Sequence, residues 1–141
     1  MLGIKQGAKK EASNKCDVYY KTYYEMPLDD NLIYFESRDG LDFTGNILRI
    51  AQELCRDDCY AHLRFCVRTR NDVKDKIYSM AGRYGLAMSR FSFVDEEWRA
   101  VEVMERARFV VSDSGMPWAY VKRAGQVVLN TWHGTPLKVM G

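Results

Sequence analysis

The sequence predicts an α/β fold: a Rossmann-like parallel sheet with helices on both faces. From Asn31 onward, short apolar segments alternate with helical patterns, and strands that alternate with helices of about 10–15 residues are typical of βαβ units. Connections between parallel strands are right-handed, which places helices on both faces of the sheet. The 141 residues are 47% hydrophobic, which is enough for one ordinary core.

Residues 1–30 are predicted to precede this domain as a basic arm and a tyrosine-rich flank. The run KQGAKKEASNK has few apolar residues, so we expect a solvated arm, with an anionic membrane surface as the alternative place for it. The next segment, CDVYYKTYYEMPLDD, is interpreted as a helix that packs on the flank of the domain. The alternative is that its tyrosines contact a membrane interface. The amphipathic stripe of this helix and the proline that ends it are Val18, Tyr19, Thr22, Tyr23, Met26 and Pro27.

Residues 31–141 are predicted to form the Rossmann-like domain, and its first half contains two strand–helix pairs. LIYFES is the first strand, and Thr44 to Arg56 is a helix because its apolar residues recur at helical spacing. AHLRFCVR is the second strand. Asn71 can cap the helix that follows, and Gly85 can end it.

The second half of the domain continues the alternation. AMSRFSFV is the third predicted strand, and Asp95 can cap a helix that carries Trp98, Val101 and Met104. RFVVSD is the fourth strand, a short helix or turn is expected around Trp118, and QVVLNTW is the fifth strand.

Polar residues follow four of the five predicted strands. Ligands of open parallel sheets bind beyond the carboxyl ends of the strands, so we expect these residues to line one rim. They are Glu36, Ser37, Arg38 and Asp39 after the first strand, Arg68, Thr69, Arg70 and Asn71 after the second, Ser112, Asp113, Ser114 and Gly115 after the fourth, and His133, Gly134 and Thr135 after the fifth.

The turn WHGTPLK after the fifth strand combines a titratable side chain with features that suit phosphate. His133 can accept a proton near neutral pH, and Gly134 lets the backbone approach a ligand closely. Thr135 and Pro136 can begin a helix, whose free N–H groups attract phosphate, and Lys138 can add a full charge. A capped turn with a hydrogen-bonded histidine and no ligand is the alternative.

Composition and missing motifs exclude several function classes. A net charge of +2 gives no argument for nucleic acid as a partner, and no apolar run approaches the roughly 20 residues of a membrane span. A signal peptide is not apparent, and four cysteines without one suggest a cytoplasmic protein. P-loop, dinucleotide and G-x-S-x-G signatures are absent.

A zinc site is the one metal centre that the residue types suggest. Cys55, Cys59, His62 and Cys66 lie close in sequence, but paired C-x-x-C spacing is missing, and two of the cysteines belong to predicted core positions. We therefore predict no metal and no cofactor.

Three runs resemble the CDP-glycerol glycerophosphotransferase family, the teichoic acid primases and polymerases of Gram-positive bacteria. They are PLDDNLIYFESRDGLDFTGNILRIAQEL, ARFVVSDSGMPWAYVKRAGQVVLNTWHGTPLK and, within the latter, the motif WHGTPLK. The resemblance covers roughly Pro27 to Gly141. The resemblance implies that His133 is the catalytic residue. The resemblance and the predicted rim together give the expected substrate-binding residues, which are Glu36, Ser37, Asn46, Asp113, Ser114, Gly134, Thr135 and Lys138.

The resemblance implies the N-terminal, acceptor-side half of a GT-B-like enzyme with two Rossmann-like domains. Such an enzyme transfers glycerol phosphate from CDP-glycerol to a lipid-linked teichoic acid-type acceptor and works as a peripheral protein at the inner face of the cell membrane. A second active-site histidine and most donor-binding residues belong to a C-terminal domain that is expected beyond Gly141, so we expect this chain to be inactive alone.

Two points stay open at the level of sequence. His133 can act as the base, or the backbone around Gly134 and Thr135 can hold phosphate together with Lys138. Arg38 and the run DFTGNI depart from the usual aromatic and Asn-Pro pattern of the family, which permits a related polyol phosphate substrate. The alternatives to the transferase are a non-catalytic α/β binding module and a GT-B transferase that uses another nucleotide-activated polyol or sugar.

Overall fold

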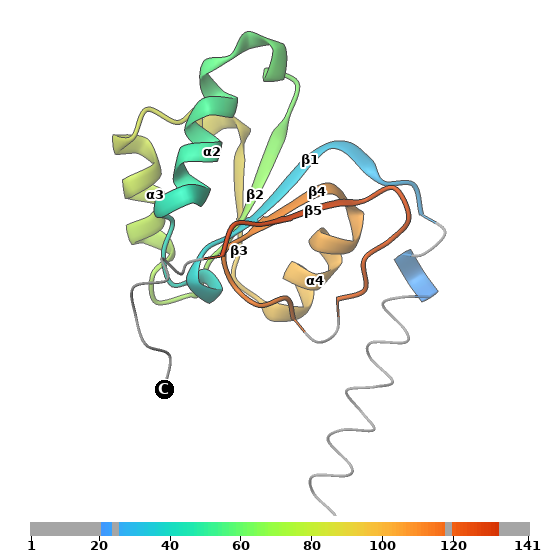
Figure 1. The fold of residues 1–141 in the computed structure, drawn as a ribbon. Coiled ribbons are helices and arrows are strands. Elements are labelled where there is room, and N and C mark those ends of the chain that lie inside the picture. Colours follow the sequence, from blue (N-terminus) through green and yellow to red (C-terminus); the bar gives the residue numbers. More distant parts are fainter. Residues whose placement is uncertain (1–20, 24–25, 118–119, 133–141) are drawn as a thin grey trace, which may run out of the picture.

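Five parallel strands form one sheet in the computed structural model, which describes residues 21–23, 26–117 and 120–132. Their order across the sheet is β3-β2-β1-β4-β5, and each neighbouring pair is parallel (Figure 1). The predicted Rossmann-like α/β fold is therefore confirmed. The strands are β1 (Asp29–Glu36), β2 (Arg64–Arg68), β3 (Phe91–Val94), β4 (Ala107–Ser112) and β5 (Val127–Asn130).

Helices cover both faces of the sheet, as predicted. Figure 1 shows α2 and α3 on one side and α4 on the other. Short 3-10 turns complete the connections. The helices and turns are α2 (Gly45–Arg56), α3 (Lys74–Arg83), α4 (Glu97–Arg106), η1 (Arg38–Gly40), η2 (Asp58–Tyr60) and η3 (Met88–Arg90).

Alternation along β1 divides the interior into two cores. Successive side chains of a strand point to opposite faces. Ile33 and Phe35 therefore pack in the core beneath α2 and α3, whereas Tyr34 packs with Ala100 and Met104 of α4. The first core is held by aromatic rings: Phe35 contacts Phe43 and Phe65, and Phe91 contacts both Phe43 and Phe65.

The strand order reverses beside β1, which is where α/β sheets bind ligands. β1 leads through α2 to β2 on one side, and the chain later returns through α4 to β4 on its other side. The register aligns the carboxyl ends of the strands, because Glu36 lies opposite Ser112 and Ser112 lies opposite Asn130. A crevice beyond this edge is the expected ligand site of such a topology.

Several predicted boundaries are wrong by a few residues. β1 begins at Asp29 instead of Leu32, the first residue of the predicted strand LIYFES. β2 begins at Arg64 instead of Ala61, because Ala61 and His62 lie in a turn that follows η2. The Asp57 carboxylate precedes η2 and accepts the Cys59 N–H at 2.9 Å. His62 therefore lies exposed in a turn and does not begin the strand. Residues 88–90 form η3 instead of strand, and β5 ends at residue 130.

Neither predicted capping residue caps its helix. α3 begins after Val73 and α4 after Glu96, and neither residue makes a side-chain capping bond. Asp95 instead lies 3.7 Å from the Lys74 ammonium. Gly85 follows the end of α3 with a φ of +70°, as a helix stop should.

The remaining expectations concern the ends of the chain and one loop. Residues 21–23 are helical, whereas Met26, which the prediction assigns to the same helix, lies in a bend. Val18, Tyr19 and Trp118 lie outside the described residues. None of the helices in the described parts of the chain has both the length and the apolar character that crossing a bilayer requires.

The aromatic cluster predicts a strong effect of Phe43→Ala. The ring is fully buried and lies 6.1 Å from that of Phe35 and 6.5 Å from that of Phe91, centroid to centroid. We expect the free energy of unfolding to fall by about 3–5 kcal/mol, measured by urea denaturation. The exposed Tyr84 is the matched control, and Tyr84→Ala should cost less than about 1 kcal/mol. Equal losses would contradict the assigned core.

Candidate functional site

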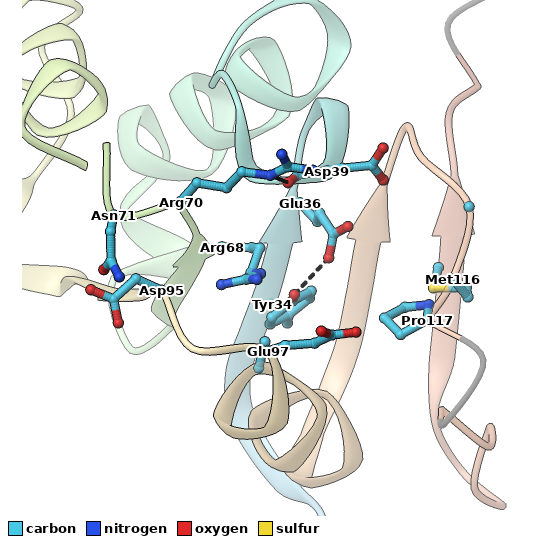
Figure 2. A pocket seen from close by; sticks show the side chains of 12 residues that line it. Tyr34, Glu36, Asp39, Arg68, Arg70, Asn71, Asp95, Glu97, Met116 and Pro117 are labelled. Carbon is cyan, nitrogen blue, oxygen red and sulfur yellow. Dashed lines mark hydrogen bonds between the residues drawn. The ribbon is translucent and has the colours of Figure 1, made fainter. Parts of the chain in front are cut away.

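A cavity of about 460 Å³ lies at the carboxyl edge of the sheet, on the side of α4 (Figure 2). We call it the rim cavity. It draws on four segments that are distant in sequence: the end of β1, the end of β2, the first turn of α4 and the segment after β4. Its lining residues are Tyr34, Glu36, Asp39, Arg68, Arg70, Asn71, Asp95, Glu97, Ala100, Gly115, Met116 and Pro117.

Glu36 is a buried carboxyl at the base of the rim cavity. Only 6% of the residue is exposed, and its Oε2 accepts the Tyr34 hydroxyl at 2.7 Å, as Figure 2 shows. Burial raises the pKa of Glu36, while the Tyr34 bond and the Arg68 guanidinium oppose that rise. Burial also raises the pKa of Tyr34 well above its usual value, so Tyr34 stays a hydrogen-bond donor.

Arg68 and Arg70 bring two guanidinium groups to the same cavity. Nη1 of Arg68 donates to the Thr69 carbonyl at 2.9 Å, and Nε of Arg70 donates to the Asp39 carbonyl at 3.2 Å. These bonds orient the two side chains. Within the described residues, the other guanidinium nitrogens make no hydrogen bond, so they can serve a ligand.

The loop after β1 adopts an unusual left-handed backbone. Arg38, Asp39 and Gly40 have φ values of +48°, +56° and +80°. This conformation costs about 1–2 kcal/mol for each residue that is not glycine. At Gly40 a Cβ atom would lie 3.2 Å from the Thr69 carbonyl carbon and 3.1 Å from Cγ of Arg68. The loop therefore packs directly on the end of β2, and a side chain in place of Gly40 would strain the backbone and press on these neighbours.

Asp113 holds this loop from the end of β4. Its Oδ2 accepts the Ser37 hydroxyl at 2.9 Å, and its Oδ1 accepts the Arg38 N–H at 2.7 Å. Ser114 adds a second bond, because its hydroxyl accepts the Asp39 N–H at 2.9 Å and donates to Asp113 at 3.0 Å. Ser37, Asp113 and Ser114 are all buried. We call these three residues the β4 clamp.

The structure brings some of the sequence-predicted site residues together and not others. Glu36 lines the rim cavity, and the three residues of the β4 clamp lie beside it, bonded to one another and to the loop that carries Asp39. Asn46 is exposed on the first turn of α2 and is not part of the cavity lining. His133, Gly134, Thr135 and Lys138 lie outside the described residues. The substrate-binding roles stay predictions.

Three features of the site were missed at the level of sequence. Tyr34 was assigned to a strand and not to the site, although an i, i+2 pair with Glu36 on one strand face was a usable signal. The sequence predicts Arg68 and Arg70 on the rim but does not single them out as binding residues. The Asp39–Gly40 dipeptide is a turn signal that indicated the left-handed loop.

The β4 clamp predicts that Asp113→Ala is destabilising. The substitution leaves the buried Ser37 hydroxyl and the part-buried Arg38 N–H without their acceptor. We expect the free energy of unfolding to fall by about 3 kcal/mol, and Asp113→Asn to recover part of that loss because one acceptor oxygen remains. Asp72→Ala, at an exposed loop position, is the control and should change stability by less than about 0.5 kcal/mol. An Asp113→Ala protein as stable as this control would refute the clamp.

Burial of Glu36 predicts a pH-dependent stability. A carboxyl whose folded-state pKa lies above its usual value of 4.5 favours folding while it is protonated, and that contribution is lost as the pH rises from about 4.5 through the raised pKa. Glu36→Gln removes the ionisation, so the variant should have a higher Tm than the unmodified protein at pH 7.5. The difference should be smaller at pH 4.5. The exposed Glu53→Gln should not reproduce this trend, and a Glu36→Gln advantage that does not grow with pH would contradict it.

Comparison with solved structures finds the same fold in a larger protein. The structure of the Wall Teichoic Acid Polymerase TagF is 22% identical with a TM-score of 0.70, and the match covers 96% of this chain and 30% of that chain. A histidine-to-asparagine variant of TagF soaked with CDPG is 21% identical with a TM-score of 0.71 and the same coverage. This chain thus spans about 30% of the length of the TagF chain.

Comparison with protein families places the whole sheet in one family. Among curated proteins, no match was found. The family model described as CDP-Glycerol:Poly(glycerophosphate) glycerophosphotransferase matches residues 18–141, which include every strand and helix given above. The match therefore extends over far more than half of the chain. The chain belongs to the CDP-glycerol:poly(glycerophosphate) glycerophosphotransferase family.

Proposed function

We propose that this chain is the N-terminal, acceptor-side domain of an enzyme that transfers glycerol phosphate from CDP-glycerol to a lipid-linked, teichoic acid-type acceptor. The family match over residues 18–141 is the observation that carries the proposal. The Rossmann-like fold and the cavity at its carboxyl edge are consistent with one substrate-binding half of a GT-B-like enzyme.

The proposal includes a division of the protein into parts. Residues 1–30 form a basic arm and a flank, residues 31–141 form the acceptor-side domain, and a donor-binding domain belongs to sequence beyond residue 141. The share of the TagF chain that is matched, 30%, leaves room for such a domain. Because the acceptor is attached to lipid, the enzyme would act as a peripheral protein at the inner face of the cell membrane.

The transfer itself needs a base and a cradle for phosphate. The acceptor hydroxyl attacks the phosphorus that carries the glycerol; the new P–O bond forms as the bond to CMP breaks, and the hydroxyl proton passes to a base. His133 is the proposed base. The backbone around Gly134 and Thr135, with Lys138, is proposed to hold the phosphate oxygens. In support, β5 ends level with the rim, where the Thr131 N–H donates to the Ser112 carbonyl at 2.9 Å.

Replacement of His133 tests this function. In a protein that continues beyond residue 141 into the donor-binding domain, we expect His133→Ala to lower CMP release from CDP-glycerol about 10²–10⁴-fold. The chain contains two histidines, so the other one is the matched control: His62 is exposed in the turn before β2, and His62→Ala should leave the rate unchanged.

Two outcomes would count against the proposal. An undiminished rate for His133→Ala would rule out the assigned base. No CMP release from the extended, unmodified protein with CDP-glycerol and acceptor would rule out the transferase itself. The chain of 141 residues alone should release no CMP, because it is proposed to lack the donor-binding domain.

A further inference from the structure

We propose that the rim cavity binds a polyol phosphate unit, with hydroxyl groups at Glu36 and Tyr34 and one phosphate group at Arg68 and Arg70. This inference rests on the proposed function for the enzyme class. It adds a ligand and a set of binding residues to a cavity whose lining, apart from Glu36, had no assigned role.

The carboxyl end of β1 supplies the part of the cavity that suits hydroxyl groups. Glu36 is more than nine-tenths buried, and Tyr34 is the one hydrogen-bond partner of its carboxyl group among the described residues. The carboxylate has room for further donors, because its two oxygens together can accept about four hydrogen bonds. A buried polar group with spare acceptors is stabilised by a ligand that brings O–H groups, and polyols bring several.

The carboxyl end of β2 supplies the part that suits phosphate. One nitrogen of Arg68 and one of Arg70 are bonded to backbone carbonyls, and these bonds fix the direction of each guanidinium. Their remaining N–H groups can bind phosphate oxygens through charge-assisted hydrogen bonds. Figure 2 shows Arg68 reaching into the cavity beside Tyr34 and Glu36, so both parts of the site face the same space.

Three carboxylates around the cavity favour a ligand with a single phosphate. Asp39, Asp95 and Glu97 also line it, and among the described residues the one ion pair of these three carboxylates joins Asp95 to Lys74, at 3.7 Å. A nucleoside diphosphate would place two phosphate groups beside these carboxylates, which is unfavourable. A polyol phosphate brings one phosphate and otherwise hydroxyl groups, which carboxylates accept. The volume of about 460 Å³ lies within the usual range of small-ligand sites, about 300–1,000 Å³.

Two sources can supply this ligand: the polyol phosphate of the acceptor and the glycerol phosphate end of the donor. The experiment titrates the 141-residue chain, labelled with ¹⁵N, with sn-glycerol 3-phosphate, glycerol, inorganic phosphate and CDP-glycerol, and follows backbone amide signals around the cavity. We expect glycerol 3-phosphate to bind at least about tenfold more tightly than inorganic phosphate, and glycerol alone to bind weakest. Weaker binding of CDP-glycerol than of glycerol 3-phosphate assigns the cavity to the acceptor, and tighter binding assigns it to the donor.

Two variants separate the two halves of the site. Arg70→Gln should weaken glycerol 3-phosphate and inorganic phosphate alike, about tenfold, because it removes a phosphate ligand. Glu36→Gln should weaken glycerol 3-phosphate about tenfold and leave inorganic phosphate unchanged. Folding does not confound this variant, since it is expected to be the more stable protein at neutral pH. Arg83→Gln, which removes the same charge from an exposed position at the end of α3, is the matched control and should change neither affinity.

The inference is overturned if inorganic phosphate binds as tightly as glycerol 3-phosphate, if none of the ligands binds, or if Arg70→Gln and Arg83→Gln have equal effects. These failures leave the proposed function standing, because the titration requires no transfer. Conversely, polyol phosphate binding by this chain, combined with no CMP release from the extended protein, would support the cavity and refute the transferase.

Discussion

The arrangement of loops at the carboxyl edge of this sheet depends on the hydrogen bonds that the Asp113 carboxylate accepts. It ties the end of β4 to the loop after β1 across the point where the strand order reverses. Left-handed backbone at Arg38 and Asp39 is unfavourable by about 1–2 kcal/mol each, and the part-buried hydrogen bonds that Asp113 and Ser114 accept from these two residues offset that cost. Strained backbone that its surroundings hold in place is characteristic of functional sites. Here it positions Asp39 over the cavity and allows Arg70 to bond to the same loop.

Strand alternation places two polar side chains, Tyr34 and Glu36, on the same face of β1, next to the loop that the β4 clamp holds. Phe35 completes the aromatic core beneath α2 and α3, whereas Tyr34 and Glu36 face α4. The first turn of α4 lines the rim cavity together with Glu36. The space between β1 and α4 is therefore open at the carboxyl edge of the sheet and is not filled by core side chains. The alternation of side chains along β1 that separates the two cores therefore also places the Glu36 carboxyl and the Tyr34 hydroxyl on the face of the sheet that borders the rim cavity.

Much of this arrangement follows from local sequence, and the rest depends on contacts between distant segments. The strands, their parallel arrangement and the helices on both faces were predictable, because apolar periodicity and right-handed crossovers leave few alternatives. Glu36 was predictable as a residue at a strand end. The clamp was not, because the bond between Ser37 and Asp113 joins residues 76 positions apart. The wrong prediction of Asp95 as a helix cap has a similar cause. Aspartate is a good capping residue by type, but in the folded chain Asp95 lies beside Lys74 instead.

The position of Glu36 is better explained by binding than by stability. A carboxyl that is almost wholly buried with one hydrogen-bond partner is costly to ionise, and its raised pKa is the direct expression of that cost. Glutamine has nearly the same shape and could accept the Tyr34 hydroxyl without carrying a charge. A sequence shaped by stability alone would therefore favour the amide. The carboxylate is advantageous only if a ligand enters the cavity and donates hydrogen bonds to it. In the absence of a ligand, the positive charge of the Arg68 guanidinium favours the ionised form of Glu36.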